Sequence, residues 1–250
     1  MKPYAAQQKA LPSFPRTLHL PYQPNATNDD YVASEEEASV IFSMPVNVEE
    51  KIDGASVGMA LFQDHPLLRN RDHILSKGYF KNTPAKEQFR PMWNWFYDNV
   101  HRFENLNING PYSVYGEWCL GQHGLEYDKL PDWFIAYDLY HQEEERFMEP
   151  LMARKILQEC GFTVPRALLQ TDLNGSMSKN YPLMRYEALA EYAHYTSPWA
   201  KDNAKSEGIY VKTFDSDYVV NRFKMVRPSF IRGALWSPDK LSRNSLKSEK

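Results

Sequence analysis

The sequence predicts an α+β fold with antiparallel sheets and flanking helices. Short apolar segments that contain β-branched and aromatic residues recur along the chain, separated by turn residues. Apolar residues at helical spacing occur in a few longer stretches. The 250 residues are 42% hydrophobic and 14% aromatic, which is typical of a globular chain with a substantial core. Helices packed outside antiparallel strands account for both patterns.

The expected strands flank the segments that carry the most distinctive residues. Two short ones lead up to Lys51, and the tight Asp53-Gly54 turn separates them from a third. The last two form a closing pair near the end of the chain. The strands and extended segments are expected at residues 40–42, 46–48, 56–62, 67–75, 112–118, 133–140, 208–214 and 218–226.

Three helices are expected outside these strands. The first follows Thr83 and Pro84, a plausible N-cap and first-turn proline, and Pro91 delays or kinks it. Its aromatic stripe is better explained by core packing than by base stacking. The second covers about residues 148–160 and ends at Gly161, and a shorter third one covers roughly 186–194.

We expect a single domain with a core at residues 46–230. Residues 1–45 are predicted to be an N-terminal arm and lead-in, because the first thirty residues are rich in Pro, Asn and Thr. Residues 231–250 are predicted to be a basic tail, too short for another domain. From Arg222 onward there are eight Lys or Arg against two acids, so this end of the chain is suited to phosphate contacts. A solvated tail is the alternative for residues 236–250.

Several classes of protein are disfavoured. No stretch approaches the roughly 20 apolar residues of a membrane span, and the N-terminus lacks the apolar run of a signal peptide. Two cysteines, Cys119 and Cys160, fit a reducing interior, so a cytoplasmic or host-intracellular location is expected. The chain has no phosphate-loop or Gly-x-Ser-x-Gly motif, and its seven histidines show no metal-ligand spacing.

Lys51 is the candidate nucleophile. A lysine that attacks phosphorus must be neutral, close and in line with the leaving group. Glu49, Glu50 and Asp53 would raise its pKa, so activation must come from a metal or from Lys212, Arg222 and Lys224. A lone Lys-x-Asp-Gly is more often a solvated hairpin turn, so the other segments decide the interpretation.

A nucleoside triphosphate would need contacts to its ribose. Glu117, on an expected strand, can accept hydrogen bonds from ribose hydroxyls. Arg69 and Arg71 are two residues apart, so on a strand they share a face and can approach sugar and phosphate together. A paired buried acid and strand-edge charges are the ordinary alternatives.

The base, the metal and the phosphates have candidates as well. Phe134 can stack on the base, with Trp133 or Tyr137 as substitutes, unless it is simply a core residue. Glu207 can bind a divalent metal directly or through water. Charge on the phosphates can be neutralised by Lys212, Arg222 and Lys224.

The ordered set of segments resembles the covalent nucleotidyltransferases, the superfamily of polynucleotide ligases and mRNA capping enzymes, and most closely the ATP-dependent RNA ligases. The segments are 49–54, 68–71, 115–118, 134–138, 207–212 and 222–227, and the resemblance covers about residues 46–230. Phe14 to Leu20 also looks like a segment that precedes the lysine in some small RNA ligases. The resemblance implies an ATP-grasp-like ligase adenylation fold, and the chain has no room for a C-terminal OB-fold domain.

The resemblance also implies residue roles. Lys51 would become linked to AMP, with Asp53 and Lys224 as further catalytic residues and Glu207 and Asp53 at the metal. The implied nucleotide contacts are Glu50 beside the base, Arg71 (or Arg69) and Glu117 at the ribose, Phe134 stacked on adenine, and Lys212, Arg222 and Lys224 at the phosphates. Arg222 stands where many relatives have lysine, which alters geometry.

The expected reaction is ATP-dependent RNA ligation through lysyl-AMP, with Mg²⁺ or Mn²⁺. The expected partner is RNA with 5′-phosphate and 3′-hydroxyl ends, and end-healing enzymes are candidate partners. The protein is expected to be a monomer that does not bind membranes. DNA nick sealing, GMP transfer and a non-catalytic nucleotide- or RNA-binding module remain the alternatives.

Overall fold

The computed structural model describes residues 3–21, 30–76, 84–170, 186–237 and 239–249, and its strands form two five-stranded sheets. In order across the first sheet lie β1 (Leu18–His19), β10 (Val219–Val226), β9 (Gly208–Phe214), β2 (Val46–Lys51) and β8 (Ala167–Gln170). In order across the second lie β4 (His65–Asn70), β3 (Ala55–Phe62), β5 (Tyr112–Trp118), β6 (Phe134–His141) and β7 (Arg146–Phe147). The pairings are antiparallel except that of β1 with β10, so the predicted α+β class is confirmed.

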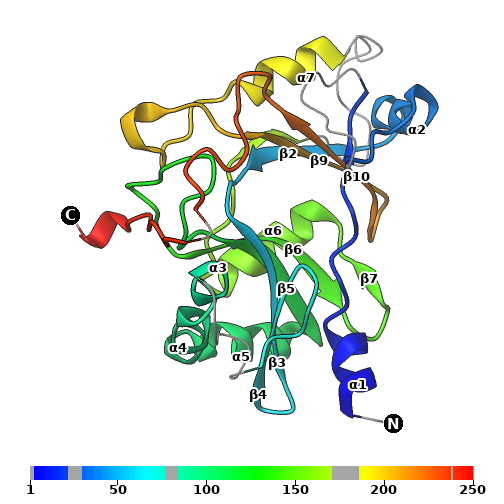
Figure 1. Cartoon of the computed structure of the whole chain (residues 1–250). Coiled ribbons are helices and arrows are strands. Elements are labelled where there is room, and N and C mark those ends of the chain that lie inside the picture. The colour runs from blue at the N-terminus through cyan, green and yellow to red at the C-terminus, as the bar shows by residue number, and fades with distance from the viewer. Residues whose placement is uncertain (1–2, 22–29, 77–83, 171–185, 238, 250) are drawn as a thin grey trace.

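The chain crosses from one sheet to the other directly after Lys51. β2 ends at Lys51 in the first sheet, and β3 begins at Ala55 in the second (Figure 1). Gly54 is required at this crossing by close approach, since a Cβ there would lie 2.8 Å from the Trp118 carbonyl oxygen and 3.0 Å from Glu117 Cγ. The candidate nucleophile therefore stands at the junction of the two sheets.

One face of the first sheet is covered by short helical elements, α2 (Glu35–Ser39), η1 (Val40–Phe42) and α7 (Tyr186–Ala193). The predicted strand at 40–42 is wrong, because these residues continue α2 as a 3₁₀ turn. Ser34 starts the helix through a capping box. Its hydroxyl accepts from the Glu37 N–H, and the Glu37 carboxylate accepts from the Ser34 N–H.

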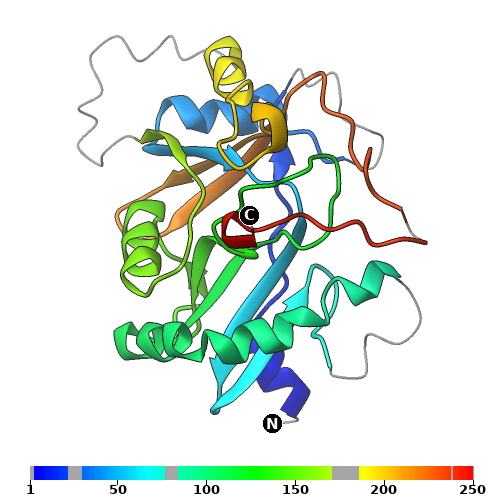
Figure 2. The ribbon, with the colours of Figure 1, turned by 90° about the vertical axis from the view of Figure 1, so that its left-hand side faces the viewer.

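Helices α4 (Pro91–Asp98), α5 (Val100–Asn109) and α6 (Pro150–Glu159) lie against the second sheet (Figure 2), and the short α3 (Pro84–Glu87) precedes α4. The single kinked helix predicted after Thr83 is thus three short ones, and Thr83 itself lies outside the described residues. Pro91 occupies the first turn of α4, where its missing N–H costs nothing. Phe96 and Phe103 stack at a centroid distance of 4.0 Å, so the aromatic stripe is core, as predicted.

The prediction of an irregular arm is wrong for residues 3–10 and 18–19, whereas residues 11–17 between them form no helix or strand. Residues Pro3–Ala10 form α1, and Leu11 and Leu20 are completely buried. β1 joins the edge of the first sheet, whereas α1 lies beside the second (Figure 1). The two buried leucines hold this segment against the core, which its proline-rich composition does not predict.

The C-terminal residues 241–249, named here the C-terminal strap, pack on the fold and end in η4 (Lys247–Glu249). The solvated-tail alternative is therefore wrong for this segment. Asn244 is 5% exposed and Leu246 packs against a core cluster. In Figure 2 the strap runs beside the loop at 119–130. No helix among the described residues has the length and apolar character to cross a membrane.

Candidate active site

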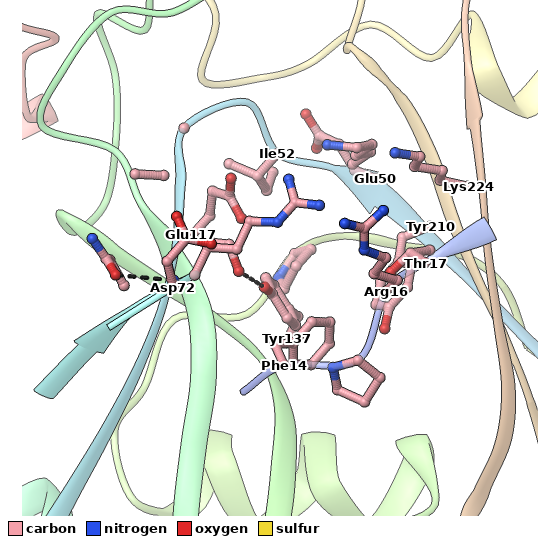
Figure 3. Close-up of a pocket in the computed structure, with 18 of the residues that line it drawn as sticks. Phe14, Arg16, Thr17, Glu50, Ile52, Asp72, Glu117, Tyr137, Tyr210 and Lys224 are labelled. Carbon is pink, nitrogen blue, oxygen red and sulfur yellow. Dashed lines mark hydrogen bonds between the residues drawn. The ribbon is translucent and has the colours of Figure 1, made fainter. Parts of the chain in front are cut away.

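A cavity of about 440 Å³ lies where the chain crosses between the two sheets (Figure 3). Glu50 and Lys51 line it from β2, Glu117 from β5 and Lys224 from β10. Arg71, Tyr137 and Tyr210 line it as well, so the cavity brings together residues from all six segments picked out in the sequence.

The Lys51 amine lies at one end of an ion pair with Glu207. Its Nζ donates to Glu207 Oε2 at 2.7 Å, and the two side chains are 24% and 8% exposed. The register explains the pairing, because Lys51 of β2 stands opposite Gly208 of β9, the residue after Glu207. A contact between residues 156 positions apart is thus fixed by two neighbouring strands.

Carboxylates set the electrostatics around this amine. Burial alone would lower the pKa of Lys51, but the negative charges of Glu207 and Glu117 raise it above its ordinary value. Burial in turn raises the pKa of Glu117 to about 8, helped by Glu207 and Asp53 and opposed by Lys51. Burial also raises the pKa of Glu207. The site holds more carboxylates than cations close to Lys51, so it favours added positive charge.

Asp53 is bound by the loop at 119–130. Its Oδ2 accepts from the N–H groups of Gly124 and Leu125, both at 2.7 Å, and its own N–H donates to the Tyr127 hydroxyl at 3.0 Å. Asp53 is 7% exposed and is not among the residues that line the cavity. It lies close enough to Lys51 for their charges to interact, and its hydrogen bonds fix the turn that follows Lys51.

Glu50 is the most isolated acid of the cavity. It is 1% exposed, and neither carboxylate oxygen has a hydrogen-bond partner among the described residues. Burial raises its pKa to about 7, although the positive charge of Arg166 opposes the rise. A buried polar group without a partner is costly, so this carboxyl is available to a ligand.

The basic residues of the last two segments separate into two groups. Lys224 lines the cavity, and burial lowers its pKa, with the charge of Lys51 adding to the effect. Lys212 and Arg222 do not line it. Lys212 Nζ lies 2.8 Å from Asp138 Oδ1 and 3.0 Å from Glu49 Oε2, and Arg222 Nε lies 3.3 Å from Asp138 Oδ2.

The direct phosphate contacts predicted for Lys212 and Arg222 are therefore corrected. Both cations neutralise the buried carboxylate of Asp138, which no sequence argument singled out. Burial would raise the pKa of Asp138, but Lys212 and Arg222 hold it below its ordinary value. This buried cluster joins β9 and β10 of the first sheet to β6 of the second.

Of the two candidate arginines, the structure brings only Arg71 to the cavity. Arg69 is 1% exposed and donates to the Leu11 carbonyl at 2.8 Å and to the Ser13 hydroxyl at 2.6 Å. Its guanidinium thus anchors the N-terminal segment. β4 ends at Asn70, so Arg71 no longer follows the strand alternation that the prediction assumed.

The stacking role predicted for Phe134 is also corrected. Phe134 is completely buried in the helix-facing core, with its ring centroid 5.4 Å from that of Trp95. Its substitute Tyr137 lines the cavity, and the Tyr137 hydroxyl is hydrogen-bonded to Ser56 Oγ at 3.0 Å. In Figure 3 the rings of Tyr137 and Phe14 lie together on the cavity wall.

The N-terminal segment contributes a cavity wall that residue-type arguments missed. Phe14, Pro15, Arg16 and Thr17 all line the cavity, and Arg16 points toward Glu50 and Lys224 in Figure 3. The one signal in the sequence was the resemblance of residues 14–20 to a segment of small RNA ligases. The pairing of β1 with β10 holds this segment in place.

The site offers a metal ion oxygen ligands, but the described residues do not form a complete set of protein ligands. In the part of the chain that the structure describes, no group of three or more His, Cys, Asp or Glu is arranged to hold a metal. The carboxylates of Glu207 and Glu117 beside the cavity are of the type that Mg²⁺ and Mn²⁺ prefer. The donor chemistry fits a divalent ion that also binds the phosphates of a ligand.

Comparisons with known proteins agree with this geometry. A family model described as RNA ligase matches residues 44–226. The fold is similar to that of the Naegleria gruberi RNA ligase with PPi, at 18% identity and a TM-score of 0.53. That match covers 74% of this chain and 50% of the other. A mutant of the same ligase with ATP and Mn matches at 20% identity and a TM-score of 0.52, with the same coverage.

The chain spans about half the length of these solved ligases. No curated protein matches it. The structural likeness confirms the predicted nucleotidyltransferase fold, and the family match extends over most of the chain, from before β2 to the end of β10. The chain therefore belongs to the RNA ligase family.

Proposed function

We propose that this chain is an ATP-dependent RNA ligase that joins 5′-phosphate and 3′-hydroxyl ends through a lysyl-AMP intermediate. The observation that carries the proposal is the position of Lys51, which lines a cavity between two sheets and is paired with Glu207. The cations Arg16, Arg71 and Lys224 line the same cavity, as a polyphosphate requires. A solvated hairpin lysine would have neither feature.

In the first step the Lys51 amine attacks the α-phosphorus of ATP. A nitrogen–phosphorus bond forms, the bond to the bridging oxygen of the β-phosphate breaks, and pyrophosphate leaves with that electron pair. The amine must lose its proton first, and the raised pKa of Lys51 opposes this loss. A divalent ion bound to Glu207 would supply positive charge that offsets the carboxylates and favours the neutral amine.

The remaining two steps transfer the AMP group. An oxygen of the RNA 5′-phosphate attacks the AMP phosphorus, and the nitrogen–phosphorus bond breaks as Lys51 recovers its electron pair and takes up a proton. A 3′-hydroxyl then attacks the activated 5′-phosphate, loses its proton and releases AMP. Lys224 and Arg71 line the cavity, which supports a role for both in stabilising the charge on these phosphates.

The nucleoside contacts follow from the cavity walls. Tyr137 supplies the aromatic face for the base, in place of Phe134, and the unpartnered Glu50 carboxyl is available to its polar edge. Glu117 accepts from ribose hydroxyls. The metal preferred in the reaction is Mg²⁺ or Mn²⁺, and Mn accompanies ATP in the matching Naegleria structure.

The experiment is self-adenylylation with ATP labelled at the α-phosphate. The protein is expected to acquire a covalent label that is lost in acid and survives alkali. Lys51→Ala should abolish it, and Lys155→Ala, at an exposed lysine of α6, should leave it unchanged. An undiminished label in Lys51→Ala would overturn the proposal. GTP in place of ATP, and nicked DNA in place of RNA, test the capping and DNA-ligase alternatives.

A further inference from the structure

Tyr31 presents an aromatic ring to solvent at the edge of the first sheet. It is 57% exposed, and its neighbour Val32 is 47% exposed. The backbone is nevertheless fixed, because the His19 N–H donates to the Tyr31 carbonyl at 2.7 Å and the Ala33 N–H donates to the His19 carbonyl at 2.8 Å. These bonds extend the sheet beyond β1 by one short segment. The ring therefore stands on a rigid support.

The ring is continuous with the wall of the cavity. The guanidinium carbon of Arg16 lies 4.5 Å from the Tyr31 ring centroid, and Arg16 also lines the cavity. A strand of nucleic acid that leaves the cavity beside Arg16 would meet this ring next. Planar aromatic rings and guanidinium groups are the side chains on which single-stranded bases stack.

Basic side chains lie close to Tyr31, although the whole chain has a net charge of −3. The carboxylate of Asp30 lies 2.8 Å from Arg232 Nη1 and 3.6 Å from Lys224 Nζ. His19 also contacts Asp30, but burial lowers the pKa of this histidine to about 4, so it is neutral at pH 7. Lys224 and Arg232 thus share the Asp30 carboxylate, and Arg16 stacks on the neighbouring Tyr31 ring.

We propose that Arg16, Tyr31, Lys224 and Arg232, named here the Tyr31 surface, bind the RNA strand whose 5′-phosphate receives AMP. The first base beyond that phosphate stacks on the Tyr31 ring, and the cations hold the adjoining phosphates. The proposal rests on the proposed ligase function and names the residues that would hold the polynucleotide next to the cavity. It gives a function to Arg232, one of the basic residues that follow the family match.

The ligation steps allow a sharp test, because self-adenylylation needs no RNA. The full chain and its variants Tyr31→Ala and Tyr31→Phe are first charged with labelled AMP, and transfer to a 5′-phosphorylated single-stranded RNA is then followed at increasing RNA concentration. Tyr97→Ala is the matched control, since Tyr97 is 50% exposed on α4 and does not line the cavity. Melting temperatures verify that all variants fold.

Tyr31→Ala should leave the rate of self-adenylylation within about twofold of wild type. It should raise the RNA concentration at half-maximal transfer by about 5- to 150-fold, the range expected for one base–aromatic stack. Tyr31→Phe should restore wild-type transfer, because it retains the ring, and Tyr97→Ala should not alter transfer. Unchanged RNA dependence in Tyr31→Ala would overturn the inference.

The two proposals fail in different ways. Absence of any lysyl-AMP in the wild-type chain would contradict the ligase function itself. In that case, direct binding of the same RNA, followed by fluorescence anisotropy, still tests the Tyr31 surface: weaker binding by Tyr31→Ala than by Tyr97→Ala supports it, and equal binding rejects it.

Discussion

Lys51 Nζ donates to Glu207 Oε2 at 2.7 Å, which links the end of β2 to the residue that precedes β9. Glu207 is the carboxylate in direct contact with the candidate nucleophile, and Glu117 and Asp53 add to its effect. While this pair is intact, the amine is held protonated, because the charge of Glu207 raises the pKa of Lys51. Under the proposed function, a ligand that draws Glu207 away would lower the pKa of Lys51 and favour the neutral amine.

Glu207→Gln is expected to shift the pH dependence of self-adenylylation. Removal of the negative charge lowers the pKa of Lys51, so the neutral amine appears at lower pH and the rising limb of the rate profile moves toward acid. The maximal rate should fall roughly tenfold or more, because a metal-binding carboxylate is lost. Rates measured from pH 6 to 10 give both quantities.

Glu126→Gln is the matched control for this variant. Glu126 also pairs with a lysine, Lys201, at 3.1 Å, but both side chains are well exposed. The pH–rate profile of Glu126→Gln should coincide with that of wild type. A Glu207→Gln profile that moves toward alkaline pH would contradict the assigned electrostatics.

Glu50 should make stability depend on pH. Its pKa is raised from 4.5 to about 7 by burial, so between these values the folded chain holds a proton that the unfolded chain releases. Stability contributed by this group is therefore present at pH 4 and lost as the pH rises through 7. Glu50→Gln has no carboxyl to ionise, so it avoids the loss of stability at high pH. It should therefore be more stable than wild type by about 3 kcal/mol at pH 8.

Urea unfolding at pH 5 and pH 8 measures this difference. The advantage of Glu50→Gln should be larger at pH 8 than at pH 5. Glu143→Gln, at an exposed position, should show no such change. Equal effects of Glu50→Gln at both pH values would show that this carboxyl does not titrate in the stated range.

Variants of Tyr137 should weaken ATP binding, whereas a variant of Phe134 should lower stability. Tyr137→Ala removes the aromatic wall of the cavity and should raise the KM for ATP by about 5- to 150-fold. Tyr137→Phe keeps the ring and should stay close to wild type. Phe134→Leu removes part of a buried ring and should cost about 1–3 kcal/mol of stability with the KM for ATP unchanged. A raised KM only in Phe134→Leu would restore the original assignment.

The C-terminal strap should influence the nucleophile through Tyr127. Asn244 Oδ1 accepts from the Tyr127 N–H at 2.8 Å, and its Nδ2 donates to the carbonyls of Cys119 and Gly121. Tyr127 in turn accepts from the Asp53 N–H. Asn244→Ala should therefore cost about 1–3 kcal/mol and slow self-adenylylation at saturating ATP.

Two further variants determine whether this effect is specific. Tyr127→Phe keeps the ring but loses the hydroxyl that accepts from Asp53, so it should also lower kcat with little change in the KM for ATP. Arg243→Ala, at the exposed neighbour of Asn244, should do neither. If Asn244→Ala lowers the melting temperature but leaves kcat unchanged, the strap is structural only.

The sequence predicts the strands well where the apolar pattern and the turns agree. β5 and β9 have the bounds expected for them, and the closing pair β9 and β10 is antiparallel. Lys51, Glu117 and Glu207, which belong to three of the sequence motifs, also lie close together in the structure. Residues 40–42 were misassigned because their β-branched composition outweighed the Ser34 capping box, a local signal that the sequence does contain.

Side-chain direction was harder to predict. Phe134 and Tyr137 both belong to β6, and only the packing of α4 to α6 determines which face of the strand becomes core. The sequence predicts Lys212 and Arg222 as phosphate ligands because it does not reveal their buried partner Asp138, which lies on a strand of the other sheet. Such contacts depend on how the sheets stack, which local patterns do not encode.

The most direct test of the central claim is peptide mass spectrometry of the full chain after incubation with ATP and Mg²⁺ or Mn²⁺. The account predicts that the peptide containing Lys51 gains the mass of one AMP and that fragmentation assigns it to this lysine. It also predicts that added pyrophosphate removes the adduct. An adduct on another residue, or none under conditions where the folded chain binds ATP, would contradict it.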